Sequence, residues 1–328
     1  MLKAKAAYDW QPACSLDILQ FRAQMLSQLR VFFAQRNVLE VETPALYPFT
    51  NPDPMIEGFE VLETQHHSDS LHLQTSPEFS MKRLLAAGSG AIYQICRAYR
   101  KSESGRYHNP EFTILEWYRP GYTLHQLMKE VTELLVEVLP VSCLPHQAVY
   151  LTYQSVFSKA VGIDPLSASL NDFESAAETL GYPEAQMICA DNRSAWLDFM
   201  FSHVVQPDLQ LQRIVFVYNY PACQSALARL HPQQPEVAER VEVFINGVEL
   251  GNGFQELTDS KEQRQRFIQQ QRERIEHGMT VPSLDEDFLA ALDAGIPETA
   301  GIAIGLDRLL MSACSMDTIS QVLTFPLR

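Results

Sequence analysis

Two stretches of sequence decide the fold: YRKSESGRYHNPEFTILEWY at residues 99–118 and RVEVFINGVELGNGF at residues 240–254. In the first, strand-like residues 91–100 and 111–119 flank ten polar, glycine-containing residues, which predicts an antiparallel hairpin with a long loop. In the second, Asn246-Gly247 separates two apolar runs, and this dipeptide is the strongest short-range hairpin signal because both residues tolerate a positive φ. The sequence therefore predicts an α+β protein in which helices flank an antiparallel sheet.

The segments before the first hairpin predict a helix and then short extended elements. Residues 15–36 repeat apolar side chains at helical spacing after a cap at Ser15 or Asp17. VETPALYP at 41–48 alternates and ends in proline, and LHLQTSPEF at 71–79 predicts a strand that turns into a helix.

The later segments are mostly helical in pattern. Residues 123–232 predict helices interrupted by the apolar run RIVFVYNYP, and they suggest packing rather than chemistry. A helix is expected near 260–277, and TAGIAIGLDRLL at 299–310 predicts a small-residue strand that enters a helix. No internal repeat is visible.

Composition excludes several classes of protein. The 328 residues are 46% hydrophobic, which is typical of a globular chain. A formal charge of -15 disfavours binding to a phosphate backbone. The six cysteines are widely spaced, so we expect reduced thiols rather than zinc or disulfides. The N-terminus lacks a secretory signal and no stretch is apolar enough to cross a membrane, which predicts a cytoplasmic protein.

The second hairpin brings two acids together. With a two-residue turn, 245 faces 248, 244 faces 249 and 242 faces 251, so Glu242 and Glu249 share one face. Such a pair can hold Mg²⁺ together with substrate phosphates, or it can be two solvated surface acids. Gly251 and Gly253 bracket Asn252, which favours a bulge that turns Asn252 inward, although an ordinary strand end is the alternative.

The first hairpin also offers ligand-binding side chains. Phe112, Ile114, Glu116 and Tyr118 alternate onto one face, which would suit an adenine stack that continues into an amine site, or simply a half-buried sheet. The donors around the loop could bind phosphate, although loops also carry such residues for solubility; they are Arg100, Arg106, His108 and Asn109. Neither a dinucleotide-binding fingerprint nor a phosphate-binding loop is present.

These segments resemble, in their order along the chain, the catalytic domain of class II lysyl-tRNA synthetases. The resemblance rests on SPEF (76–79), the two hairpins and GIAIGLDR (301–308), and it covers about residues 15–328. It implies a single catalytic domain over 15–328 after a tail of residues 1–14, and a homodimer with Pro44 at its interface.

The resemblance also implies a site for ATP, Mg²⁺ and an amino acid. Arg100 and Arg308 would be catalytic, on the α- and γ-phosphates, and Phe112 would stack on adenine. Glu242 and Glu249 would hold Mg²⁺. The implied ATP-binding residues are Arg100, Lys101, Ser102, His108, Asn109, Phe112, Glu249, Leu250, Gly305 and Arg308. The implied amino-acid-binding residues are Ser76, Pro77, Glu78, Glu116, Tyr118, Asn252, Glu256 and Ala303.

The sequence departs from the synthetases in four places. Only 14 residues precede the first helix, so no anticodon-binding domain is expected and tRNA is an unlikely partner. Ala303 replaces a central glycine, NPDPMIEGF (51–59) replaces the amino-acid loop, and Ser102 replaces an acid that reads adenine. A stand-alone chain of this kind is similar to the family of elongation factor P (R)-β-lysine ligases.

That second resemblance implies the reaction. (R)-β-lysine would be activated as an adenylate at the expense of ATP, which yields AMP and pyrophosphate, and elongation factor P would be the acceptor. The alternatives are a synthetase that activates α-lysine or charges tRNA, and a non-catalytic regulatory paralogue.

Overall fold

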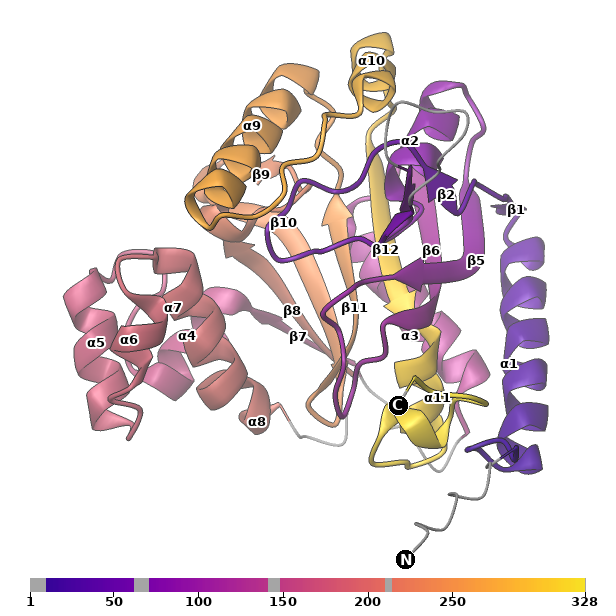
Figure 1. Ribbon diagram of the computed structural model, residues 1–328, viewed down its shortest axis with the longest axis horizontal. Helices are drawn as coiled ribbons and strands as arrows, with labels where there is room; N and C mark the ends of the chain where they lie inside the picture. Colours follow the sequence, from indigo (N-terminus) through magenta and orange to yellow (C-terminus); the bar gives the residue numbers. More distant parts are fainter. Residues whose placement is uncertain (1–9, 62–70, 141–147, 210–213, 328) are drawn as a thin grey trace, which may run out of the picture.

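The computed structural model describes residues 10–61, 71–140, 148–209 and 214–327. A nine-stranded sheet forms its centre, with the strand order β1-β5-β6-β12-β11-β10-β8-β7 and with β9 beside β10 (Figure 1). The strands of this sheet are β1 (Leu39–Glu40), β5 (Ile92–Tyr99), β6 (Glu111–Pro120), β7 (Ala148–Thr152), β8 (Ile214–Pro221), β9 (Leu230–His231), β10 (Gln234–Ile245), β11 (Val248–Gln255) and β12 (Thr299–Gly305). A small second sheet contains β2 (Leu46–Tyr47), β4 (Leu71–Leu73) and β3 (Glu60–Val61).

Both predicted hairpins are confirmed. β5 pairs with β6 across the long loop, and β10 pairs with β11 across Asn246 and Gly247, whose φ angles are 51° and 76°. The sheet is not wholly antiparallel, however, because β1 runs parallel to β5 and β7 runs parallel to β8.

Within residues 123–232 the described elements are mainly helices, the predicted interruption RIVFVYNYP contains β8, and β7 is a strand that the sequence interpretation did not identify. Parallel neighbours need a crossover connection, and the helices between β7 and β8 supply it. They are α4 (Tyr153–Val161), α5 (Leu170–Thr179), α6 (Ala185–Cys189), α7 (Arg193–Met200), the π-helical turn η2 (Phe201–Val205) and α8 (Gln206–Asp208). These helices form a lobe beyond the β7 edge of the sheet, around its own apolar cluster (Figure 1).

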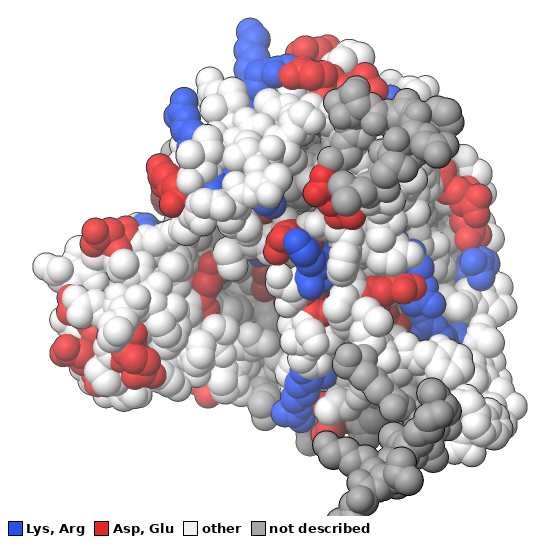
Figure 2. Space-filling model, in the orientation of Figure 1, with Lys and Arg blue, Asp and Glu red and all other residues white. Residues whose placement is uncertain are grey.

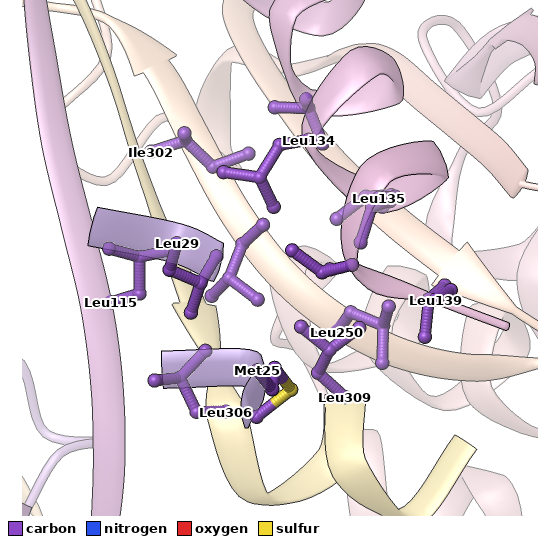
Figure 3. Close-up of a cluster of buried hydrophobic side chains, with 14 of the residues drawn as sticks. Met25, Leu29, Leu115, Leu134, Leu135, Leu139, Leu250, Ile302, Leu306 and Leu309 are labelled. Carbon is purple, nitrogen blue, oxygen red and sulfur yellow. The ribbon is translucent and has the colours of Figure 1, made fainter. Parts of the chain in front are cut away.

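One face of the sheet is covered by α1 (Leu16–Gln35), α3 (Leu124–Val138) and α11 (Leu306–Ala313). Ser15 rather than Asp17 caps α1, because its Oγ accepts the amide of Ile18 at 3.3 Å. Side chains from all three helices meet residues of β6, β11 and β12 in the main core (Figure 3). Since Leu115 and Ile302 point into this core, their neighbours along the strands point to the opposite face.

The opposite face carries α2 (Glu78–Ala86), α9 (Ser260–Glu276) and α10 (Glu286–Ala294) near one end. A third apolar cluster joins them, and it includes Met81, Phe267 and Phe288. Two short 3₁₀ turns, η3 (Ala222–Gln224) and η4 (Ile319–Gln321), complete the described elements. None of the helices in the described part of the chain is long and apolar enough to span a membrane.

The cysteines follow the expectation where they can be seen. No disulfide joins the cysteines that the structure describes, and Cys143 lies outside the described residues. The tail of residues 1–14 is described only from residue 10.

Candidate active site

A β-bulge aligns the second hairpin differently from the predicted register. Phe244 faces Glu249 as expected, but the pairing then shifts, so that Val243 faces Gly251 and Glu242 faces Asn252. The predicted pairing of 242 with 251 is therefore wrong. The shift turns Asn252 onto the face that carries Glu242, which is the inward turn that the flanking glycines suggested.

One row of side chains crosses the open face of the sheet. Gln94 lies opposite Glu116, Glu116 opposite Ala303, Ala303 opposite Asn252, and Asn252 opposite Glu242. Directly opposed residues share a face, so these five positions from five strands are neighbours. The row joins two predicted regions, the amino-acid pocket and the pair of acids.

Next to this row lies a buried acidic pocket. Tyr118 donates its hydroxyl to Glu116 Oε1 at 2.7 Å. Glu116 is 3% exposed, and its Oε2 has no hydrogen-bond partner among the residues that the structure describes. An unpaired buried carboxylate oxygen is costly, so Glu116 is suited to receive a donor from a ligand.

A residue that the sequence interpretation missed completes the pocket. The side chain of Lys82 is 0% exposed, and its Nζ lies 2.7 Å from Glu78 Oε1 and 2.5 Å from Glu256 Oε2. Glu78 is four residues before Lys82 on α2, and this spacing was a readable signal for an ion pair. The burial of Lys82 could not be predicted from the sequence, because lysines are rarely buried.

Burial raises the pKa values of the acids in the pocket. The pKa of Glu116 is raised to about 8, by burial first and then by the negative charge of Glu78. Burial also raises the pKa of Glu256 to about 7, although Lys82 acts against it. Without a cationic ligand the pocket therefore holds protons near neutral pH.

Gly301 makes room for this pocket. A Cβ atom at Gly301 would lie 2.5 Å from Glu256 Oε1 and 2.5 Å from the ring carbons of Tyr118. Real Cβ atoms do not approach other atoms so closely. The small residues of β12 thus allow a carboxylate and a phenol to meet across the strand.

At the other end of the site, Arg308 joins three elements. Its Nε donates to the carbonyl of Tyr107 at 3.1 Å, and its Nη1 lies 3.4 Å from Glu249 Oε2. Its Nη2 is 2.6 Å from His108 Nε2. Burial and the Arg308 charge lower the pKa of His108, which leaves a neutral imidazole beside the guanidinium.

Arg100 lies between the long hairpin loop and the start of α2. Its Nη1 contacts Glu103 Oε1 at 3.0 Å, and its Nε donates to the carbonyl of Thr75 at 3.3 Å. The guanidinium carbon is 5.1 Å from the centroid of Phe112. Ser76 accepts the amide of Glu78 at 3.1 Å, with Pro77 between them at the N-cap of α2. Arg100, which the resemblance predicts to be catalytic, thus contacts the segment that leads into the predicted amino-acid-binding residues Ser76, Pro77 and Glu78.

The remaining predicted ATP-binding residues differ in what their side chains contact. Lys101 and Ser102 both bond to the carboxylate of Glu57, at 2.9 and 3.1 Å. The Asn109 amide donates to the carbonyl of Glu111 at 2.6 Å and accepts the amide of Leu327. The side chain of Leu250 is buried in the main core, so only its backbone can face a nucleotide. Gly305 precedes α11 directly, one turn before Arg308.

The pair of acids on the second hairpin fits a divalent cation. Glu242 Oε1 accepts from Arg240 Nη2 at 2.6 Å. Burial raises the pKa of Glu242 to about 7, and the charge of Glu249 acts in the same direction against Arg240. A cation would relieve this repulsion. The described residues contain no group of three or more His, Cys, Asp or Glu side chains that could hold a metal ion by themselves.

Arg240 also connects the site to the helical lobe. Its Nε donates to Asn252 Oδ1 at 3.2 Å and its Nη1 donates to the carbonyl of Gln224 at 2.7 Å. The Gln224 amide in turn donates to Asp198 Oδ1 on α7 at 2.6 Å. Residues 123–232, for which the sequence suggested only packing, therefore help to hold Arg240 in place.

The surface around the site mixes both charges. Figure 2 shows acidic and basic side chains next to each other around the hollow in the middle of the molecule, between the helical lobe and the body. Such a surface suits a ligand that carries both ammonium and phosphate groups.

The sheet, the four segments that carry the resemblance and this mixed site define a class II synthetase-type activation domain. Comparison with protein families agrees, since the model of the class II tRNA synthetases (D, K and N) matches residues 5–328. The chain belongs to this family.

Curated relatives narrow the comparison. A protein of Histophilus somni (strain 2336) is 45% identical over 320 residues, which cover 97% of each chain. Proteins of Proteus mirabilis and Edwardsiella ictaluri are 46% identical over 321 and 323 residues, again with 97% of each chain covered. All three are named elongation factor P (R)-β-lysine ligase.

Proposed function

We propose that this chain is an ATP-dependent ligase that activates (R)-β-lysine as an adenylate and transfers it to a lysine side chain of elongation factor P. The observation that carries the proposal is the buried pocket of Glu78, Glu116 and Glu256, in which an oxygen of Glu116 lacks a partner in the described structure. When all three acids are ionised, they and the one buried lysine carry two net negative charges, which match a substrate with two ammonium groups. The names of the full-length relatives point to the same substrate and acceptor.

The first step requires alignment rather than a base. An amino-acid carboxylate is already ionised at neutral pH. Its oxygen forms a bond to the α-phosphorus while the bond to the bridging oxygen breaks, and pyrophosphate leaves. Arg100 would hold the α-phosphate and the amino-acid carboxylate, Asn252 would hold the same carboxylate, and Arg308 would hold the γ-phosphate. Phe112 would stack on the adenine.

Glu242 and Glu249 would hold Mg²⁺, which supplies charge neutralisation for the phosphates. Arg240 keeps both Glu242 and Asn252 in place, so the metal carboxylate and the amide of the amino-acid site have a fixed separation. His108 would add a neutral donor near the γ-phosphate beside Arg308.

In the second step, the amine of the acceptor lysine attacks the carbonyl carbon of the adenylate and AMP leaves. This amine has an ordinary pKa of about 10.4 and must lose a proton before it attacks. The net charge of -15 disfavours a nucleic acid as the acceptor and is compatible with a protein.

Pyrophosphate exchange tests the activation step. We expect ATP-pyrophosphate exchange that depends on (R)-β-lysine and is much slower with α-lysine. Faster exchange with α-lysine would favour a lysine-activating synthetase instead, and no exchange with either isomer would favour a non-catalytic paralogue.

We expect Ala303 to determine whether (R)-β-lysine or α-lysine is activated. Its methyl group projects from the row between Glu116 and Asn252. Moving the amino group from C2 to C3 leaves room that this methyl fills, whereas it crowds an α-amino group. Ala303→Gly is expected to shift the ratio of kcat/KM toward α-lysine by about tenfold, since one methylene discriminates by about 1–3 kcal/mol. An unchanged ratio of the two exchange rates would contradict this account.

We also propose a cytoplasmic homodimer. Val31 on α1, Leu39 on β1 and Leu46 on β2 are exposed, and Leu46 is two residues after Pro44 in the chain; such apolar side chains suit an interface between subunits. Sedimentation velocity would show a single species of twice the chain mass, and a monomer at micromolar concentration would contradict it.

A further inference from the structure

Lys82 is the one cation of the described pocket, and nothing in the proposed reaction uses it directly. It extends from α2 to meet a carboxylate of its own helix and a carboxylate that follows β11, two elements far apart in the sequence. Its side chain is fully buried, and the ring of Phe288 lies 6.0 Å from Nζ. Burial of an unpaired ammonium is strongly unfavourable, so the ion pairs with the two acids keep Lys82 in this position.

We propose that Lys82 is a positioning residue that turns one oxygen of Glu78 and one oxygen of Glu256 toward itself, leaving their other oxygens for the ammonium groups of the substrate. This inference rests on the proposed function, because it assigns those oxygens to the diamine. The Lys82 ammonium forms ion pairs with Oε1 of Glu78 and Oε2 of Glu256, so one cation fixes the rotamers of both acids.

The charges around Lys82 support this role. The titratable groups that face one another here are Glu78 and Lys82 on α2, Glu116 and Tyr118 on β6, Cys96 on β5, and Glu256 after β11. Burial lowers the pKa of Lys82, but the charges of Glu256 and Glu78 outweigh burial and raise it. Lys82 therefore stays charged, and it opposes the rise in the pKa values of Glu116 and Glu256, whereas Glu78 adds to that rise.

Lys82 and Glu78 have opposite effects on the pKa values of the nearby acids, so the pH dependence of kcat/KM tests the proposal. A substrate ammonium binds ionised carboxylates, so kcat/KM for (R)-β-lysine in the wild type should rise with pH through about 7 to 8, where Glu256 and Glu116 lose their protons. In Lys82→Met the rise should move to higher pH by about one unit or more, the effect of losing one nearby opposite charge. Lys82→Arg should restore the position of the rise.

The experiment measures ATP-pyrophosphate exchange between pH 6 and 10 for the wild type and each variant. Lys159→Met, at an exposed lysine of α4, is the matched control and should leave the profile unchanged. A lower rate in Lys82→Met with an unmoved profile would mean that Lys82 serves only packing, and would overturn the proposal.

A second variant decides the question if Lys82→Met does not fold. Glu78→Gln removes a like charge while Lys82 keeps Glu256 as its partner, so the rise should move to lower pH. An unmoved or upward-shifted rise would contradict the inference. Absence of exchange in the wild type with either lysine isomer would instead contradict the proposed function, so the two failures are distinguishable.

Discussion

Glu116→Gln is expected to lower kcat/KM for (R)-β-lysine by about a hundredfold or more, with little change in the KM for ATP. The substitution preserves the shape of the side chain, and the Tyr118 hydroxyl can still donate to the amide oxygen in the place of Oε1. The amide nitrogen would then stand where the unpaired Oε2 is, and it would present a donor to the substrate ammonium. Removing one partner of a buried charge pair typically costs about 2–5 kcal/mol.

Exchange kinetics at varied (R)-β-lysine and varied ATP would measure this effect. Glu133→Gln is the matched control, because this acid has a 60% exposed side chain and pairs with Arg36, which directly follows α1. The control should behave as the wild type. If Glu116→Gln kept its kcat/KM for (R)-β-lysine, the pocket would not be the ammonium site.

Gly301→Ala is expected to abolish most of the activity and also to destabilise the fold. The added Cβ would meet Glu256 Oε1 and the Tyr118 ring at 2.5 Å, and both side chains are fully buried. One of them must move, and a displacement of about 1 Å at a reacting site can cost about a hundredfold in rate. Overpacking of this kind also costs about 1–3 kcal/mol of the free energy of unfolding.

Urea unfolding and pyrophosphate exchange would separate the two effects. The same substitution at Gly105 is a useful control, since a Cβ there meets nothing within 4 Å and the backbone has no positive φ. Gly105→Ala should unfold within about 0.5 kcal/mol of the wild type. Full activity in Gly301→Ala would show that Glu256 and Tyr118 need not meet across β12.

Local signals in the sequence predicted much of the fold. Asn246-Gly247 fixed the turn of the second hairpin, and the alternation along residues 111–119 correctly separated Glu116 and Tyr118 from Leu115 and Trp117. Both signals depend only on neighbouring residues. The predicted helices at 15–36 and 260–277 were right for the same reason.

The errors arose where distant parts of the chain decide the structure. The glycines beside Asn252 indicated a bulge but not the register that results from it, in which Val243 faces Gly251 and Glu242 faces Asn252. β8 is buried on both faces, so its sequence lacks the alternation that marks a strand. Lys82 is buried only because two acids from separate elements converge on it. Local alternation predicted which face Glu116 and Tyr118 share, but nothing local predicted the buried counter-charge of Lys82.

The mass of elongation factor P tests the central claim most directly. The acceptor would be incubated with this chain, ATP, Mg²⁺ and (R)-β-lysine, and then analysed by intact-mass spectrometry and peptide mapping. Our account predicts a mass increase of one β-lysyl group on a single lysine side chain, and none when ATP is omitted. Unmodified elongation factor P, together with the charging of tRNA in a parallel reaction, would contradict it.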